Sequence, residues 1–237
     1  MKITDLIIHR AFCQANLIKG YQYLDDAGKI MCKYDDRLPE WRVGVEGLIM
    51  RNPQKGGGDA LKQLSVNVQR IWLAFHEPAT VNYVLNHATS ILLDISEIIH
   101  VQAYSRLGVR FQFLYKVDDF ARALHDFSHT VLDFSKINWD QIGEIQGLTV
   151  QSRHAVGDTL AATINLSPVL RREAKAEEIT RDKLPQYAMM IDVDTFTSGE
   201  FRVERAVLRK FFRQVQEFLQ GPLPTFLTPI LEGGTHD

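Results

Sequence analysis

Hydrophobic side chains recur at odd positions from residue 99 to residue 117, near the middle of the chain. The apolar members fall on odd positions: Ile99, Val101, Ala103, Leu107, Val109, Phe111, Phe113, Tyr115 and Val117. A period of two predicts a β-strand with one face toward a core. At about 3.3 Å per residue such a run would reach roughly 60 Å, several times the usual strand length. We therefore expect it to bend, with Ser105 and Gly108 as the favoured positions.

Shorter alternating segments predict further strands on both sides of this central one. They cover residues 3–18, 30–34, 41–50, 64–76, 144–154, 158–166 and 187–196. Asp25-Asp26-Ala27-Gly28 predicts a turn, and Asn52-Pro53 through Gly56-Gly57-Gly58 predicts a flexible hairpin loop. Residues 168–183 are rich in charge and indicate an exposed loop or a short helix.

Apolar residues at helical spacing predict helices in three other places. These are residues 81–95, residues 120–134, which follow an N-cap at Asp118-Asp119, and residues 207–219, which end at Gly221-Pro222. A last short turn is expected at 224–231.

The strands outnumber the helices, so parallel crossovers cannot connect them all. The expected fold is α+β: a mostly antiparallel sheet with one very long central strand, about three helices packed on it and a long amphipathic C-terminal helix. We expect one domain over 1–237, or two lobes, 1–117 and 118–237, that share the central strand and have their boundary near 116–119.

Composition restricts the classes of function. The 237 residues carry a net charge of −2 with a pI near 6.4, so nucleic acid is not indicated by the total and would need a local patch. No apolar run approaches the roughly 20 residues of a membrane span, and no cationic leader is seen, so no membrane role and a cytoplasmic location are expected. The chain is long enough to fold without a cofactor, metal or disulfide. Cys13 and Cys32 are therefore read as small buried residues.

Two groups of residues suggest chemistry. Tyr104, Arg106 and Arg110 lie on the polar face of the central strand, where two guanidinium groups suit a phosphate or carboxylate ligand. Asp192 and Asp194 share one face of a later strand and offer oxygen ligands to a divalent metal. The alternative for both is structural: the two aspartates pair with the two arginines across strands.

Other features have simpler interpretations. His125 and His129 lie four residues apart on a helix, as in zinc sites, but no metallopeptidase glutamate accompanies them, so a solvated face is preferred. The C-terminal segment carries many apolar residues, for which core packing and a partner or self-association surface are both open. They are Phe211, Phe212, Phe218, Phe226, Leu227, Ile230 and Leu231.

The segment Ser105-Arg106-Leu107-Gly108-Val109-Arg110-Phe111, followed by Ile191-Asp192-Val193-Asp194 and a long final helix, resembles a sporadically distributed bacterial family of unknown function. The resemblance covers roughly the second half of the chain. It implies a single α+β protein and lends no catalytic residues.

Together these features favour a non-enzymatic cytoplasmic bacterial protein that acts by binding, as a homodimer or with a protein partner through its C-terminal segment. The resemblance adds an expected role as an accessory component of a defence or mobile locus. The alternative is an enzyme that handles a small anionic ligand or nucleotide, with Arg106, Arg110, Asp192, Asp194 and a divalent metal. The two hypotheses differ in whether those four groups satisfy one another or line an open cavity.

Overall fold

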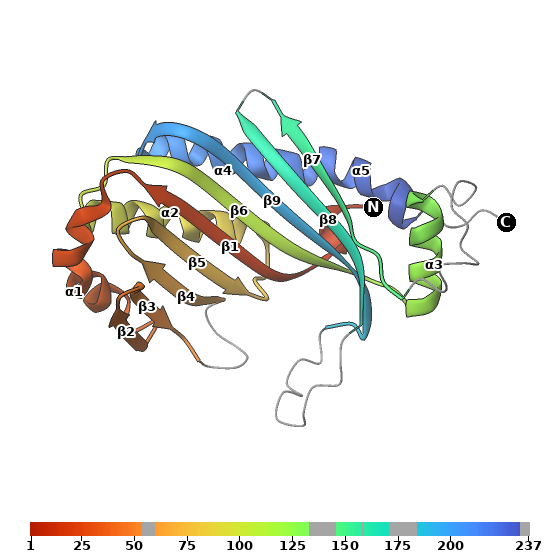
Figure 1. The fold of residues 1–237 in the computed structure, drawn as a ribbon, viewed down its shortest axis with the longest axis horizontal. Coiled ribbons are helices and arrows are strands. Elements are labelled where there is room, and N and C mark those ends of the chain that lie inside the picture. Colours follow the sequence, from red (N-terminus) through yellow and green to blue (C-terminus); the bar gives the residue numbers. More distant parts are fainter. Residues whose placement is uncertain (54–59, 133–145, 158, 171–183, 233–237) are drawn as a thin grey trace.

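The computed structural model describes residues 1–53, 60–132, 146–157, 159–170 and 184–232 (Figure 1). Its strands form one antiparallel sheet in the order β2-β3-β4-β5-β1-β6-β9-β8-β7. They are β1 (Ile7–Leu17), β2 (Glu40–Gly44), β3 (Gly47–Arg51), β4 (Leu61–Val66), β5 (Arg70–His76), β6 (Ala103–Lys116), β7 (Val150–Val156), β8 (Leu160–Leu170) and β9 (Tyr187–Arg202). The helices are α1 (Tyr23–Tyr34), α2 (Val81–Ile98), α3 (Phe120–Val131), α4 (Arg205–Gln220) and α5 (Pro222–Leu231), with 3-10 turns η1 (Ile3–Asp5) and η2 (Gly20–Gln22). The expected α+β class with an antiparallel sheet is confirmed.

One face of the sheet is covered by α2, α4 and α5, which lie behind it in Figure 1. The odd positions of β6 expected to face a core, such as Val109 and Phe111, are fully buried there. In the neighbouring β1 the buried positions are small: Ala11, Cys13 and Ala15. None of the helices in the described parts of the chain is long and apolar enough to cross a bilayer.

The order of elements is similar on the two sides of the central β1–β6 pair. β1 is followed by α1, the four-stranded meander β2-β3-β4-β5 and α2. β6 is followed by α3, the three-stranded meander β7-β8-β9 and α4. In each half the last strand of the meander returns to pair with the first strand of that half, β5 with β1 and β9 with β6. The two halves then meet because β1 and β6 pair antiparallel.

The central strand is shorter than the alternation predicts, and it is not the only long one. β6 begins at Ala103, because Ile99 closes the last turn of α2 with its N–H bonded to the Ile95 carbonyl at 2.9 Å. β9 beside it has 16 residues against 14 in β6. The ladders of β6 with both β1 and β9 shift register between Tyr104 and Arg106. The expected irregularity is therefore found at Ser105.

Helix α1 replaces a predicted turn and a predicted strand. The acidic run before Gly28 indicates a turn, but Tyr23, Asp26, Ile30 and Tyr34 are buried at helical spacing. Gly28 lies on the exposed side of this helix, and nothing there requires a glycine, because a side chain would meet no atom within 4 Å. The expected last turn, likewise, is helix α5, which starts with Pro222 in its first turn, where the missing N–H costs nothing.

Two segments that are each expected to form a single strand form hairpins instead. They are β2-β3 within 41–50 and β4-β5 around 64–76. The hairpin predicted from 144 to 166 is confirmed as β7-β8. The triple-glycine loop and most of the charged segment 168–183 lie outside the described residues.

Candidate functional site on the open face of the sheet

The face of the sheet opposite α2, α4 and α5 carries the residues that the sequence singles out. We call it the open face, because no helix of the described residues lies over it (Figure 1). Strand pairing arranges its side chains in rows that run across the sheet. One row joins Phe12, Arg110 and Asp194, and the next joins Arg10, Gln112 and Asp192. A third row joins Trp72, Gln14, Gly108 and Phe196.

The two arginines and two aspartates pair with each other. Arg110 donates from Nε to Asp192 Oδ1 at 2.7 Å, and its Nη2 contacts the second carboxylate oxygen, so the pairing is bidentate. Arg106 Nη2 donates to Asp194 Oδ2 at 3.3 Å. Both pairs are diagonal, because the residue directly opposite Arg110 is Asp194 and the one opposite Arg106 is Ser198. The four residues therefore form the cross-strand ion pairs of the structural alternative.

Gly108 gives Arg106 the room for its diagonal course. A Cβ at this position would lie 3.3 Å from Phe196 Cβ and 3.6 Å from the central guanidinium carbon of Arg106. That carbon sits 4.7 Å from the centre of the Phe196 ring, and Arg153 approaches the same ring at 5.7 Å. The space that the glycine leaves is therefore used by a side chain of this protein, and the ring is held in cation–π contact with two guanidinium groups.

Burial and pairing act on these charges in different directions. The hydrogen bond that Arg110 donates to Asp192 raises the pKa of Arg110, which keeps it cationic. Burial raises the pKa of the Asp194 carboxyl, although Arg106 and Arg110 oppose this rise. The desolvation effect prevails because Asp194 has a single, long hydrogen bond to Arg106, at 3.3 Å.

Tyr104 does not belong to this face, contrary to the expected grouping with Arg106 and Arg110. The register shift at Ser105 turns it to the helix-covered side, where it is fully buried. Its hydroxyl is 2.6 Å from Ser96 Oγ and donates to the Leu92 carbonyl at 3.2 Å. Tyr104 therefore anchors α2 to the sheet and cannot contact a ligand on the open face.

The metal hypotheses find no complete ligand set. No cluster of three or more His, Cys, Asp or Glu side chains suited to a metal occurs among the described residues. The Asp192 and Asp194 oxygens accept from guanidinium groups instead. The divalent metal is therefore not supported by a third ligand.

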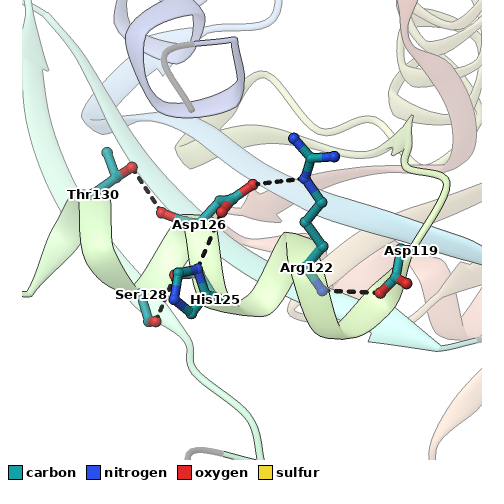
Figure 2. A network of polar contacts seen from close by, with 6 residues as sticks. All are labelled: Asp119, Arg122, His125, Asp126, Ser128 and Thr130. Carbon is teal, nitrogen blue, oxygen red and sulfur yellow. Dashed lines mark hydrogen bonds and ion pairs between the residues drawn. The ribbon is translucent and has the colours of Figure 1, made fainter. Parts of the chain in front are cut away.

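Both histidines lie on α3, and Figure 2 shows the polar contacts around His125. Asp119 caps the helix by accepting from the Arg122 N–H at 2.9 Å, as the sequence predicts. Asp126 is 3.2 Å from His125 Nδ1 and 3.6 Å from Arg122 Nε. His125 and His129 stack with ring centres 4.2 Å apart. The two histidines therefore lie on an exposed helix surface, where the polar side chains of α3 contact one another.

The pockets and cysteine thiols of the described residues do not complete an active site around the two arginine–aspartate pairs. Two pockets are lined by described residues. One, of about 420 Å³, lies around His100 and Arg205, and the other, of about 500 Å³, lies around Thr80 and Gln220. Neither contains the four charged residues. Burial raises the pKa of the Cys13 thiol to about 12, so it stays protonated. Cys32 is a free thiol and exposed, not buried as expected.

The apolar residues of the C-terminal segment pack against the core. Phe211, Phe212, Phe218 and Leu227 are buried, and the other three are half-buried against the same cluster. Core packing therefore accounts for the four buried side chains, and a partner or self-association surface at the other three stays a prediction.

Comparison of the chain with protein-family models, curated protein sequences and solved structures found no significant match in any of the three.

The residues that sequence reasoning missed are the partners contributed by other strands. Phe196 continues the spacing of Asp192 and Asp194 along one face of β9, and this signal was present in the sequence. Arg153, Phe12 and Trp72 reach the same face from β7, β1 and β5, which only the strand order reveals. The Phe12 and Trp72 rings stack with their centres 5.6 Å apart.

Proposed function

We propose that the protein acts by binding and self-associates through its edge strand β2. The observation that carries this proposal is the gathering of exposed apolar side chains at one end of the sheet. Six large hydrophobic residues are exposed in the described parts of the chain, and five of these belong to η2, α1 and the β2-β3 hairpin. They are Tyr21, Leu24, Trp41, Val43 and Val45. Figure 1 has these elements together at the left of the view.

Strand β2 combines this apolar surface with a free backbone edge. All five of its residues are exposed, and it pairs with β3 only. An edge strand presents backbone N–H and C=O groups that another strand can accept, and a large exposed apolar patch is typical of an interaction surface. Both features favour addition of a further strand at this edge.

A second copy of the chain suits this edge best. If two β2 strands pair antiparallel about Trp41, each Trp41 lies opposite the partner's Trp41. Glu40 then lies opposite the partner's Arg42, and Arg42 lies opposite the partner's Glu40. Opposite charges directly across two strands stabilise pairing, and a contact that repeats itself in this way closes a two-fold dimer.

The test is the mass of the protein in solution, measured by size-exclusion chromatography with light scattering. We expect the wild type to be a dimer and Val43→Glu to be a monomer. Leu170→Glu is the matched control, because Leu170 is similarly exposed, 51% against 55% for Val43, but lies in β8. Glu40→Arg should weaken the dimer, and the addition of Arg42→Glu should restore it. A wild type that stays monomeric at high concentration, or a dimer insensitive to Val43→Glu, would contradict the proposal.

The alternative is an enzyme that uses the four charged residues with a nucleotide or other small anion and a metal. It has less support, because the arginines and aspartates neutralise each other outside the two pockets described above. A thermal-shift screen with nucleotides and Mg²⁺ tests it: a stabilisation lost in Arg106→Ala would favour the enzyme. An accessory role in a defence or mobile locus is a proposal that rests on the family resemblance alone.

A further inference from the structure

The open face has a composition unlike that of the chain as a whole. Between the register shift at Ser105 and the far end of β6, the rows that cross β5, β1, β6, β9, β8 and β7 carry five arginines and two carboxylates. The arginines are Arg10, Arg70, Arg106, Arg110 and Arg153, and the carboxylates are Asp192 and Asp194. The full chain has a net charge of −2, so this face is positive on a protein that is slightly acidic overall. A local patch of this kind is what an anionic partner requires in such a protein.

The excess charge is available at the two sides of the face. The two aspartates engage Arg106 and Arg110 in the middle. Arg70 on β5 and Arg153 on β7 are exposed, and no carboxylate among the described residues pairs with either of them. The Nε of Arg10, also on this face, is buried without a hydrogen-bond acceptor among the described residues. Five strand spacings of about 4.8 Å separate β5 from β7, so the positive groups extend over roughly 24 Å.

Three aromatic rings lie between these arginines. Phe12 and Trp72 form a stacked pair on β1 and β5, and Phe196 lies on β9 in the same row as Trp72. All three side chains are partly exposed on a face that has no covering helix. Phe196 is fixed by two guanidinium groups, so its position is set before any ligand arrives.

From this alternation of rings and guanidinium groups we infer that the open face binds single-stranded nucleic acid. Unpaired bases stack on aromatic rings and arginine planes, and the phosphates between them pair with guanidinium forks. A duplex hides the faces of its bases, and the described part of this sheet presents no projecting helix to enter a groove. The aspartate and glutamate side chains of an acidic peptide would engage the arginines but offer no aromatic ring to stack on Phe12, Trp72 or Phe196. The expected binding is tolerant of sequence, because each base offers a π-face.

This site is separate from β2, so it is tested without reference to dimer formation. The measurement is fluorescence anisotropy of labelled oligo-dT and oligo-U about 20 nucleotides long, more than the roughly 4–16 that one such platform occupies. A duplex of the same length and poly-glutamate are the comparison ligands. We expect the single strands to bind, with affinity that falls as salt rises, and the comparison ligands to bind much more weakly.

Two kinds of variant separate stacking from charge. Trp72→Ala should weaken binding about tenfold and leave the salt dependence unchanged, since it removes a ring and no cation. Arg70→Glu with Arg153→Glu should weaken binding and flatten the slope of log K against log salt by about 1.4, the value for two phosphate contacts on a single strand. Both arginines are exposed, so this variant is expected to fold even if Trp72→Ala does not.

Arg209→Glu is the matched control, because Arg209 is an exposed arginine on α4, behind the sheet. It should bind single strands as the wild type does. The inference is overturned if no single strand binds at low salt, or if the duplex or poly-glutamate binds equally well. It is also overturned if Arg209→Glu weakens binding as much as Arg70→Glu alone does.

Discussion

Removal of the Asp192 carboxylate is the most direct test of the ion-pair arrangement at the centre of the sheet. The side chain of Asp192 is 10% exposed and accepts a bidentate contact from Arg110, which is 47% exposed. A hydrogen bond to a charged group contributes about 1.5–3 kcal/mol to stability. In Asp192→Ala the freed Arg110 guanidinium turns to solvent. The expected loss in free energy of unfolding therefore lies at the lower end of this range, about 1.5–2 kcal/mol. For a chain of this size that corresponds to a fall in melting temperature of about 5 °C.

The assay is thermal and urea unfolding of Asp192→Ala beside the wild type. Glu217→Ala is the control, because the Arg213–Glu217 pair on α4 is 3.8 Å apart and both side chains are about two-thirds exposed. Such a surface pair contributes below about 1 kcal/mol. If Asp192→Ala melts like the wild type, or like Glu217→Ala, the ion pair does not stabilise the sheet. If it instead loses Mg²⁺ binding at unchanged stability, the metal hypothesis prevails.

Two further outcomes concern the neighbouring side chains. Tyr104→Phe should lower the free energy of unfolding by about 1 kcal/mol in urea titrations, because Ser96 and the Leu92 carbonyl lose a hydrogen-bond partner. It should have no effect on oligonucleotide binding. A loss of binding at unchanged stability would instead place Tyr104 on the open face. For Asp194, a pKa raised by burial means that the native state holds its proton more tightly than the unfolded chain does. Its contribution to stability is therefore largest at low pH and declines as pH rises through and above the ordinary value of 3.8. The stability of the wild type relative to Asp194→Asn should decline over that range, and a relative gain would show that pairing with Arg106 outweighs desolvation.

The sequence was sufficient for the faces of the central strands and for the charges that meet there. The alternation in β6 and the spacing of Asp192 and Asp194 identify side chains that share a face, because a pleated strand has only two sides. The same rule failed at Tyr104, where one extra residue at Ser105 exchanges the faces. Such a bulge leaves the alternation of letters intact while it changes which side each letter occupies.

Other elements could not be predicted because their signals are ambiguous or not local. The acidic residues at the start of α1 suit a turn and a first helical turn equally well, and only burial of Ile30 and Tyr34 against the core decides between them. The aromatic surface joins Phe12, Trp72 and Phe196, which are far apart in sequence. Their proximity depends on the strand order, which hydrophobic periodicity does not encode.

Each side of the β1–β6 pair, taken alone, would leave one edge of its first strand unpaired, and an unpaired strand edge accepts further strands. The pairing of β1 with β6 covers both of these edges within one chain. Any further strand that joins the sheet therefore has to pair with one of its two outer strands, β2 or β7.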